Sequence, residues 1–231
     1  MSASHVDDEF ASAGSDEPVA KANTIKPIKL VFNGDGAVGK TTFLMTMTSG
    51  KFPQEYVPTV FDNDTQFVVQ SSGAKVSLGL WDTSGRGEYN RLRILSFPGA
   101  HMILFCVGCS QPESLKNVQD TLLPEVLFHV PEARRVLLVL KTDLRDNPVF
   151  VEKLKERKEE PLSHEQCAAF ASKFGMALLE VSALRGDGMA TIGERLVELA
   201  LEEKRAPKQA TSGLGARVVA FLKTMIGGES A

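Results

Sequence analysis

Short apolar runs bounded by turn residues recur along the chain and alternate with longer segments of helical character, and this alternation constrains the fold more than any other feature. Four runs are almost continuously apolar: Ile28–Phe32, Met102–Val107, Val136–Leu140 and Leu178–Val181. Such runs are typical of strands buried on both faces, as in a parallel sheet. The pattern predicts an α/β fold with a doubly wound sheet, which binds ligands at the carboxyl ends of its strands.

A pair of shorter segments predicts one antiparallel strand at the edge of this sheet. Phe67–Val69 and Val76–Leu80 flank Ser72-Gly73, and the second segment alternates large apolar residues with serine and glycine. Two such segments around a glycine turn are typical of a β-hairpin.

Two segments carry explicit helix signals. Ser163, with Gln166 three residues later, is a capping-box pattern that predicts a helix running toward Phe174. Met189–Leu201 carries its apolar residues at helical spacing, which predicts a helix with one buried face.

The composition fits a globular protein of one domain with tails. The 231 residues are 43% hydrophobic, which suffices for a full-sized core. Lysine and arginine number 26 against 29 acidic residues, so the net charge of −3 gives no basic field and nucleic acid is not an expected partner.

No apolar run approaches the ~18 residues of a membrane span, and the N-terminus lacks the layout of a signal peptide. Since three cysteines fit a reducing compartment, we expect a soluble cytoplasmic protein.

The two ends of the chain differ in composition from the middle. Residues 1–25 are acidic and rich in serine and alanine, which predicts a disordered arm. Residues 204–231 begin as a basic linker in which Pro207 interrupts any helix that arrives from upstream. The folded unit is therefore expected at residues 26–203.

The segment after the first apolar run has the pattern of a phosphate-binding loop. It reads Gly34-Asp35-Gly36-Ala37-Val38-Gly39-Lys40-Thr41, which matches G-x-x-x-x-G-K-[ST]. Glycines let backbone N–H groups turn inward around phosphate oxygens, and the helix that follows adds its N-terminal dipole. Lys40 can reach the β- and γ-phosphates, and the Thr41 hydroxyl can ligate Mg²⁺.

Three further segments follow predicted strands where recognition of a guanine nucleotide requires them. Asp82–Gly85 places a carboxylate near the metal and a glycine N–H near the γ-phosphate. Lys141–Asp143 follows the third apolar run, and Ser182–Leu184 follows the fourth. The Asp143 carboxylate can accept hydrogen bonds from the N1–H and 2-amino groups of guanine, neither of which adenine offers. Together, these segments predict a guanine-nucleotide site.

With these motifs the sequence resembles the Rho family of small GTPases over roughly residues 28–201. The segments that carry the resemblance are Gly34–Thr41, Lys51–Pro53, Tyr56–Asn63, Trp81–Thr83, Glu88-Tyr89, Arg91–Arg93 and Leu144–Asp146. The resemblance implies a Ras-like P-loop fold: a six-stranded, mostly parallel sheet with one antiparallel edge strand and helices on both faces.

The charged segment Asn147–Pro161 corresponds to the insert helix that distinguishes Rho proteins from other Ras-like GTPases. Its own residues predict a short helix with Asn147 as N-cap, Pro148 at the first position and Pro161 as the stop. The alternative interpretation is a solvated charged loop.

The resemblance also implies roles for individual residues. Lys40, Thr59, Gly85 and Arg86 would serve hydrolysis, and Thr41, Thr59 and Asp82 would hold Mg²⁺. The residues implied to contact GTP or GDP are Asp35, Gly36, Ala37, Val38, Gly39, Lys40, Thr41, Thr42, Phe52, Tyr56, Thr59, Asp82, Gly85, Lys141, Asp143, Leu144, Ser182, Ala183 and Leu184. Phe52 would pack edge-on against the guanine, and Lys141 would lie across its face. Because Thr59 would ligate Mg²⁺ only when the γ-phosphate is present, Val57–Asn63 would be the effector surface.

Arg86 stands where the family has a glutamine that orients the attacking water. Arginine offers five donors and no acceptor, so it cannot accept the proton of that water in a hydrogen bond. We expect intrinsic hydrolysis slower than the ~10⁻⁴ s⁻¹ of an ordinary small GTPase. The competing interpretation is that Arg86 acts as an arginine finger in cis.

Two further departures lie close to the expected site. Leu140 replaces the Asn or Thr that tethers the base loop to the phosphate loop, so either nucleotide affinity falls or packing absorbs the loss. Ser84 replaces an alanine, and we assign it no role.

The C-terminus departs most from the family. The chain ends in Gly228–Ala231 and its last cysteine is Cys167, so a prenylation box is not expected. Leu214–Ile226 instead predicts an amphipathic helix, which would fold back onto the domain, dock to a partner or lie on an anionic membrane as a peripheral contact.

The sequence therefore predicts a Rho-like GTP-binding molecular switch in signal transduction, with GTP or GDP and Mg²⁺ as ligands. Effectors, exchange factors and GTPase-activating proteins are the expected partners. Arg86 favours the alternative of a hydrolysis-deficient, constitutively GTP-bound adaptor, whereas Thr59, Asp82 and Gly85 favour retained chemistry. A P-loop kinase would leave Asp143 unexplained.

Overall fold

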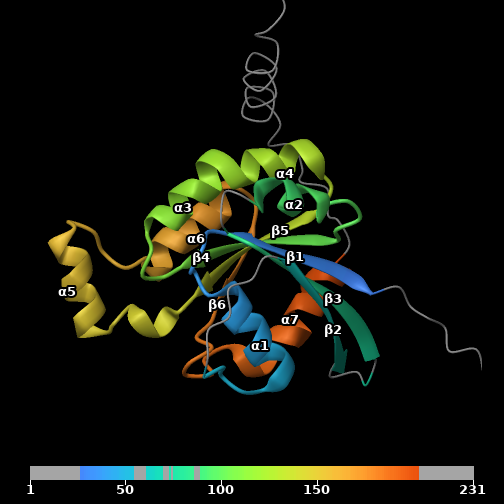
Figure 1. Cartoon of the computed structure of the whole chain (residues 1–231), viewed down its shortest axis with the longest axis horizontal. Coiled ribbons are helices and arrows are strands. Elements are labelled where there is room, and N and C mark those ends of the chain that lie inside the picture. The colour runs from blue at the N-terminus through green and yellow to red at the C-terminus, as the bar shows by residue number, and fades with distance from the viewer. Residues whose placement is uncertain (1–26, 55–60, 70–72, 74, 86–88, 203–231) are drawn as a thin grey trace, which may run out of the picture.

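A six-stranded sheet organises the part of the chain that the computed structural model describes, which is residues 27–54, 61–69, 73, 75–85 and 89–202. The strands of this part are β1 Ile28–Gly34, β2 Phe61–Val69, β3 Lys75–Thr83, β4 Met102–Gly108, β5 Arg134–Leu140 and β6 Ala177–Glu180. Their order is β2-β3-β1-β4-β5-β6, and every pair is parallel except β2 with β3 (Figure 1). The doubly wound sheet and its antiparallel edge strand are therefore confirmed.

Helices cover both faces of the sheet because the central strands are apolar on both sides. The helices of the described part are α1 Lys40–Ser49, α2 Asn90–Leu95, α3 Glu113–Asn117, α4 Leu123–His129, α5 Pro148–Glu156, α6 His164–Lys173 and α7 Met189–Leu201. Side chains of α1 and α7 share one hydrophobic cluster with Leu30, Phe32 and Leu104 of the sheet. The opposite cluster joins Val31, Ile103 and residues of α4 and α6 (Figure 1).

The stretch 113–129 is helical throughout and was not predicted from the sequence. Between α3 and α4 lies a π-helical turn, Val118–Leu122, in which the Leu123 N–H donates to the Val118 carbonyl five residues back. Pro124 follows directly, and proline lacks the N–H that an α-helix interior requires. The wider turn carries the helix past this proline, which at the level of sequence looks like a helix stop.

The β2–β3 hairpin is longer than predicted. Its register runs from Phe61 opposite Thr83 to Val69 opposite Lys75. The predicted effector segment thus enters β2 at Phe61, while residues 55–60 lie outside the described part. A strand rich in aspartate is tolerated here because β2 is an edge strand, paired on one side and open to water on the other.

The insert segment forms α5, as predicted. The Asn147 side chain accepts from the N–H groups of Val149 and Phe150, and Pro148 occupies the first helical position. The predicted stop at Pro161 is wrong, since α5 ends at Glu156. Lys158 adopts a left-handed conformation with a φ of 60°, and the Glu159 N–H bonds the Leu154 carbonyl at 2.9 Å, which closes the helix earlier.

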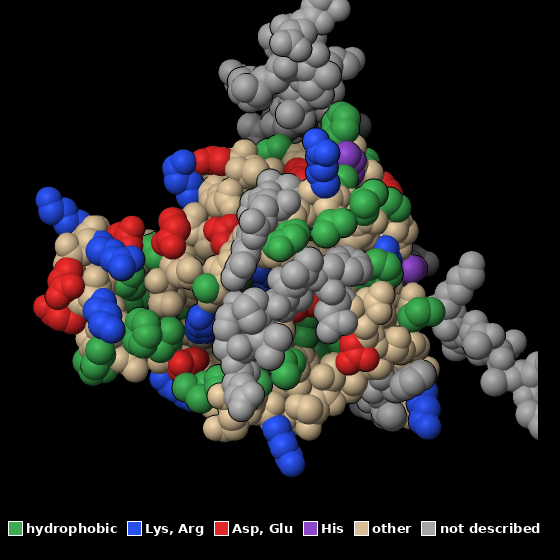
Figure 2. All heavy atoms as spheres, viewed as in Figure 1, with side chains coloured by type: hydrophobic (Ala, Val, Ile, Leu, Met, Phe, Trp, Pro, Cys, Tyr) green, Lys and Arg blue, Asp and Glu red, His purple; other side chains and the backbone are tan. Residues whose placement is uncertain are grey.

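The insert helix stands apart from the body of the protein at the left of Figure 1. Leu154 is its one buried residue, so packing holds the helix along a narrow stripe. On the face shown in Figure 2, acidic and basic side chains intermingle at this end of the molecule. A solvated charged helix, rather than a charged loop, is the outcome.

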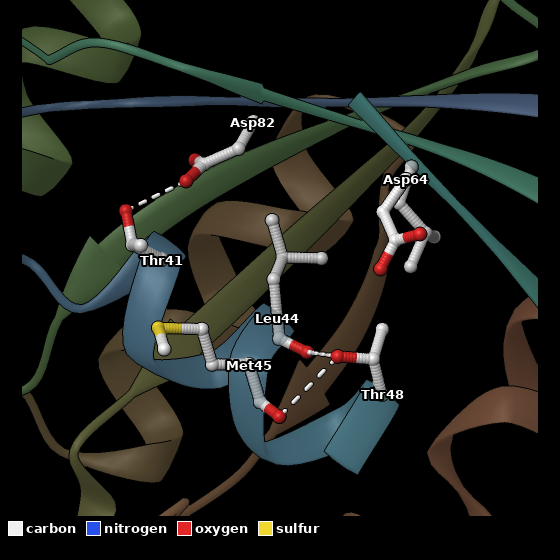
Figure 3. A pocket seen from close by; sticks show the side chains of 7 residues that line it. Thr41, Leu44, Met45, Thr48, Asp64 and Asp82 are labelled. Atoms are coloured by element: carbon white, nitrogen blue, oxygen red, sulfur yellow. Dashed lines mark hydrogen bonds between the residues drawn. The ribbon is translucent and has the colours of Figure 1, made fainter. Parts of the chain in front are cut away.

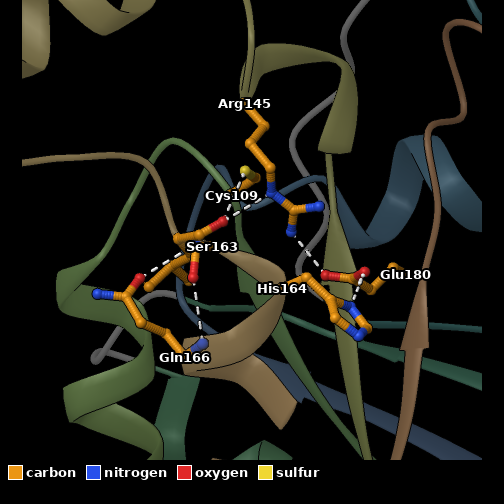
Figure 4. Close-up of polar contacts among 7 residues, drawn as sticks. Cys109, Arg145, Ser163, His164, Gln166 and Glu180 are labelled. Atoms are coloured by element: carbon orange, nitrogen blue, oxygen red, sulfur yellow. Dashed lines mark hydrogen bonds and ion pairs between the residues drawn. The ribbon is translucent and has the colours of Figure 1, made fainter.

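The capping box at α6 is confirmed and gives a first testable prediction. The Gln166 N–H donates to Ser163 Oγ at 3.2 Å, and the Ser163 N–H donates to Gln166 Oε1 at 2.9 Å (Figure 4).

A Ser163→Ala variant should lose about 1 kcal/mol of unfolding free energy in urea denaturation, because one N–H at the helix start loses its acceptor. Ser172→Ala, an exposed change in the same helix, is the control and should shift stability by less than about 0.5 kcal/mol. Equal effects of the two changes would contradict the assignment.

Several predictions fall outside the described residues. These are the acidic arm 1–25, the linker and tail 204–231 with its helix at Leu214–Ile226, and the side chains of Tyr56, Thr59 and Arg86. The division into arm, domain 26–203 and tail therefore remains a prediction. Within the described part, no helix combines the length and apolar character needed to cross a membrane.

Candidate functional site

The phosphate-loop pattern forms the turn between β1 and α1, at the carboxyl edge of the sheet. Strand β1 ends at Gly34 and α1 begins at Lys40. Within the turn, Ala37 and Gly39 adopt left-handed conformations with φ of 62° and 110°. Such residues between right-handed ones turn successive N–H groups toward a common centre, which makes a concave site for an anion. The dipole of α1 adds positive potential at the same place.

The Lys40 ammonium is folded over this turn. Its Nζ donates to the carbonyl oxygens of Gly34 at 2.9 Å and Asp35 at 2.7 Å, and the residue is only 6% exposed. Burial lowers the pKa of Lys40, while Asp82 and Asp35 nearby oppose that shift. The turn therefore holds a cation beside its N–H groups, an arrangement suited to the oxygens of a polyphosphate.

Thr41 and Asp82 are brought together although they are 41 residues apart. Thr41 Oγ1, in the first turn of α1, donates to Asp82 Oδ2, near the end of β3, at 2.6 Å (Figure 3). They line one side of a pocket that Leu44, Met45, Thr48, Asp64 and Leu80 complete. A hydroxyl and a carboxylate are hard oxygen ligands of the kind that Mg²⁺ prefers.

The donor set of Thr41 and Asp82 fits Mg²⁺. Among the described residues, no three His, Cys, Asp or Glu side chains gather in a way that could hold a metal ion. Mg²⁺ is commonly held by one or two protein groups while phosphate oxygens and water supply the rest. Thr41 and Asp82 match that requirement.

Gly85 lies directly against the phosphate loop. A Cβ built on Gly85 would lie 2.2 Å from the Asp35 carbonyl carbon and 2.2 Å from the Gly36 nitrogen. A side chain cannot be accommodated at such distances, so the close approach of the two segments depends on glycine. By contrast, a Cβ on Gly36 would find its nearest neighbour, the Gly85 oxygen, at 3.8 Å.

The two predicted base-contacting segments meet beside this loop. Asp143 follows β5 in a short 3₁₀ turn, Thr142–Leu144, and Ser182 follows β6. Ser182 Oγ donates to Asp143 Oδ1 at 2.6 Å, and both residues are buried. A carboxylate offers about four acceptor positions, so this bond orients Asp143 without exhausting its capacity to accept.

Lys141 ties the base-contacting turn to the phosphate loop. Its backbone is left-handed, with a φ of 59°, and its Nζ donates to the Ala37 carbonyl at 2.6 Å. Burial lowers its pKa, and Asp143 opposes that shift. Leu140 packs in the hydrophobic cluster, is 2% exposed and has a hydrocarbon side chain, so that side chain makes no hydrogen bond to the phosphate loop. A connection between the two loops comes instead from the ammonium of Lys141. The effect of Leu140 on nucleotide affinity stays a prediction.

Two partners of the site residues escaped the sequence analysis. Asn117 Nδ2 donates to Asp35 Oδ1, and Arg185 Nη2 donates to the backbone oxygen of Asp143 at 2.7 Å. Neither contact has a local signal, because each joins segments far apart in the chain. The only sequence hint for Arg185 is its place directly after the Ser182–Leu184 triplet.

A polar cluster of Arg145, Glu180 and His164 lies next to the base-contacting turn. The Arg145 guanidinium donates to Glu180 at 2.6 Å and to the Leu162 carbonyl at 2.8 Å, and His164 lies 2.7 Å from the same carboxylate (Figure 4). Burial alone would raise the pKa of Glu180, but the hydrogen bonds from Arg145 and His164 outweigh it and lower the pKa. This cluster joins the turn after β5 to β6 and to the start of α6.

The remaining predicted residues differ in exposure. Val38 is fully buried, and Thr42 is half-buried at the start of α1. Leu144 and Ala183 are half-buried in the two base-contacting segments. Phe52 and Leu184 expose 39% and 61% of their surface, so both present apolar side chains at the rim.

Comparison with known proteins agrees with this geometry. A family model described as the Ras family matches residues 29–202. GTP-binding protein RHO1 of Eremothecium gossypii is 40% identical over 185 residues, which cover 80% of this chain and 89% of the relative. GTP-binding protein rho1 of Schizosaccharomyces pombe is 39% identical over 80% of this chain and 92% of the relative. GTP-binding protein RHO1 of Candida albicans is 40% identical, with 78% and 92% covered.

Proposed function

Because this chain belongs to the Rho-type small GTPases of the Ras family, signalling switches that bind GTP or GDP with Mg²⁺ and hydrolyse GTP, we propose that its nucleotide lies across the carboxyl ends of β1, β3, β5 and β6. The triphosphate lies in the loop 35–42, with Lys40 beside its β- and γ-phosphates. Asp143, Ser182 and Ala183 face the base, flanked by Phe52, Lys141, Leu144 and Leu184. Tyr56 and Thr59 complete the site from the segment that the structure does not describe.

The contact that carries this proposal is the hydrogen bond between Ser182 and Asp143. It holds a buried carboxylate at the edge of the site, 39 residues from its partner in the chain, where an acceptor for guanine is required. The bond from Lys141 to Ala37 places that carboxylate in a fixed relation to the phosphate loop. The proposed base and phosphate contacts are thus linked through these two hydrogen bonds.

The chain's own residues account for the hydrolytic step. Water attacks the γ-phosphoryl group in line, the bond to the bridging oxygen breaks, and GDP and phosphate are released. Lys40 and the N–H groups of the loop stabilise the charge that develops on the phosphate oxygens. Gly85, whose N–H is proposed to face the γ-phosphate, reports its presence to the segment that follows. Thr41, Thr59 and Asp82 would hold Mg²⁺, which would supply positive charge to neutralise the β- and γ-phosphates.

The nucleotide that copurifies with the full chain tests the assignment. Protein purified in Mg²⁺ is denatured and the released nucleotide is identified by ion-exchange chromatography. The proposal requires GDP or GTP, and a predominance of adenine nucleotide would contradict it. A predominance of GTP over GDP would favour the hydrolysis-deficient adaptor to which Arg86 points.

Replacement of Arg86 by glutamine is expected to raise intrinsic GTP hydrolysis severalfold. Glutamine supplies both an acceptor and a donor for the attacking water, whereas arginine supplies donors alone. Single-turnover hydrolysis at saturating Mg²⁺ measures the effect. Arg91→Gln, the same substitution at an exposed position of α2, is the control and should leave the rate unchanged. A slower Arg86→Gln variant would instead support an arginine finger in cis, and equal rates would remove Arg86 from the mechanism.

Rho-type switches act through effectors, exchange factors and GTPase-activating proteins. We propose that effectors bind this chain at Val57–Asn63, since Thr59 within that segment would couple its shape to the γ-phosphate. The described part of the segment, from Phe61, is the start of edge strand β2 and lies opposite Thr83 of β3. This edge of the sheet therefore pairs with the end of β3, directly beside Asp82 and close in the chain to Gly85.

A further inference from the structure

The turn that carries Asp143 receives a hydrogen bond from outside on its central carbonyl. The carbonyl oxygens of Lys141, Thr142 and Leu144 accept from the backbone N–H groups of Leu144, Arg145 and Asn147, at 3.0, 3.1 and 3.4 Å. The carbonyl of Asp143 accepts instead from the guanidinium of Arg185, at 2.7 Å. The residue that faces the base is therefore the one whose backbone is held by a side chain of another loop.

Arg185 also contributes to the bond that orients the Asp143 side chain. Its backbone N–H donates to Ser182 Oγ at 3.0 Å, and the Ser182 hydroxyl donates in turn to Asp143 Oδ1 at 2.6 Å. The Gly186 N–H closes the same loop by donating to the Ser182 carbonyl at 2.8 Å. One residue thus holds the main chain of Asp143 directly and its carboxylate through Ser182.

We propose that Arg185 is a positioning residue for guanine specificity, acting through Asp143. The inference rests on the proposed function, in which the Asp143 carboxylate accepts from both N1–H and the 2-amino group. A two-point contact depends on the angle of the carboxylate as well as its position, so it requires the main chain beneath Asp143 to be fixed. A guanidinium suits this task, because it is always charged and its planar fork holds a defined direction.

The other links between the two loops leave this task to Arg185. The Thr142 N–H donates to the Val181 carbonyl at 3.3 Å and the Arg145 guanidinium donates to Glu180 at 2.6 Å, but neither bond involves Asp143 itself. The Lys141 ammonium is engaged by Ala37 of the phosphate loop, and Leu140 has a hydrocarbon side chain. Among the described residues, the Arg185 guanidinium is the side chain that bonds the main chain of Asp143.

The test compares GDP with inosine diphosphate, which lacks the 2-amino group. Affinities of both are measured for full-length protein in Mg²⁺ by displacement of a fluorescent GDP, with ADP as the reference for base recognition. In Arg185→Ala we expect GDP to dissociate about fivefold faster and the GDP-to-IDP affinity ratio to fall about fivefold, since one charge-assisted hydrogen bond is lost at a partly exposed site. Arg185→Lys, which can still donate to the same oxygen, should restore the ratio to within about twofold of wild type.

Arg195→Ala is the matched control. It removes an exposed arginine of α7 whose guanidinium donates to Glu198 of the same helix and, among the described residues, makes no hydrogen bond to Asp143 or Ser182. It should change neither affinity. Equal weakening of GDP and IDP in Arg185→Ala, or no weakening at all, would overturn the inference while leaving guanine recognition intact. A wild-type protein that bound ADP as tightly as GDP would instead overturn the proposed function itself. Should Arg185→Ala fail to fold, Arg185→Met, which keeps a long unbranched side chain but has no hydrogen-bond donor, carries the same expectation.

Discussion

An Asp143→Asn variant is expected to bind GTP and GDP about 10⁴-fold more weakly than the wild-type protein. Asparagine keeps the shape of aspartate but replaces one acceptor oxygen by a donor NH₂ group. That group would face the N1–H or 2-amino group of guanine. Two donors would then face each other at a buried site, and the hydrogen bond that the carboxylate accepts would be lost. The loss is large because the position is only 8% exposed and water cannot readily substitute.

The same change should improve binding of a base with the opposite pattern. Xanthine carries a carbonyl where guanine has its 2-amino group, so the new NH₂ group can donate to it. Competition binding with GTP and xanthosine triphosphate measures both effects on one protein. Asp146→Asn, an exposed neighbour in the same loop, is the control for charge and should leave both affinities unchanged. GTP binding by Asp143→Asn within tenfold of wild type would contradict the proposed base contact.

A Gly85→Ala variant is expected to hydrolyse GTP about a hundredfold more slowly. The added Cβ would lie 2.2 Å from two backbone atoms of the phosphate loop, whereas real Cβ contacts are essentially never under 3.0 Å. The loop and the segment after β3 must therefore separate by close to 1 Å, and a misplacement of that size can cost about 10²-fold in rate. Single-turnover hydrolysis by protein preloaded with GTP and started by addition of Mg²⁺ isolates this effect from nucleotide affinity.

Gly79→Ala, a glycine-to-alanine change in β3 that causes no crowding, is the control. A Cβ on Gly79 would meet Pro27 and Trp81 at 3.7 Å, which is ordinary van der Waals contact. This variant should keep its hydrolysis rate. If Gly85→Ala kept its rate as well, the close packing of Gly85 against the phosphate loop would not matter for the chemistry.

The strands were largely accessible from the sequence, because a strand buried on both faces is almost continuously apolar and a hairpin shows its turn. The helical stretch 113–129 was not, since Pro124 resembles a stop and the π-helical turn that accommodates it leaves no pattern. The end of α5 was misplaced for a related reason. Pro161 is a visible stop, but a left-handed Lys158 had already ended the helix.

The site divides in the same way between local and distant determinants. Motifs with fixed spacing identified the phosphate loop, Asp82, Asp143 and Ser182, and the structure brings these residues to one edge of the sheet. The residues that hold them are separated by 82 positions for Asn117 with Asp35 and by 42 for Arg185 with Asp143. No spacing rule connects such pairs, because their contact depends on how the sheet orders its strands.

The buried carboxylate of Asp143 and the phosphate loop, joined through Lys141, are proposed to select a guanine nucleotide. Calorimetric titration of nucleotide-depleted full-length protein with GTP and then with ATP, each in Mg²⁺, measures this selectivity. We expect GTP to bind at least about 10⁴-fold more tightly than ATP. Comparable affinities for the two nucleotides would show that Asp143 does not select the base.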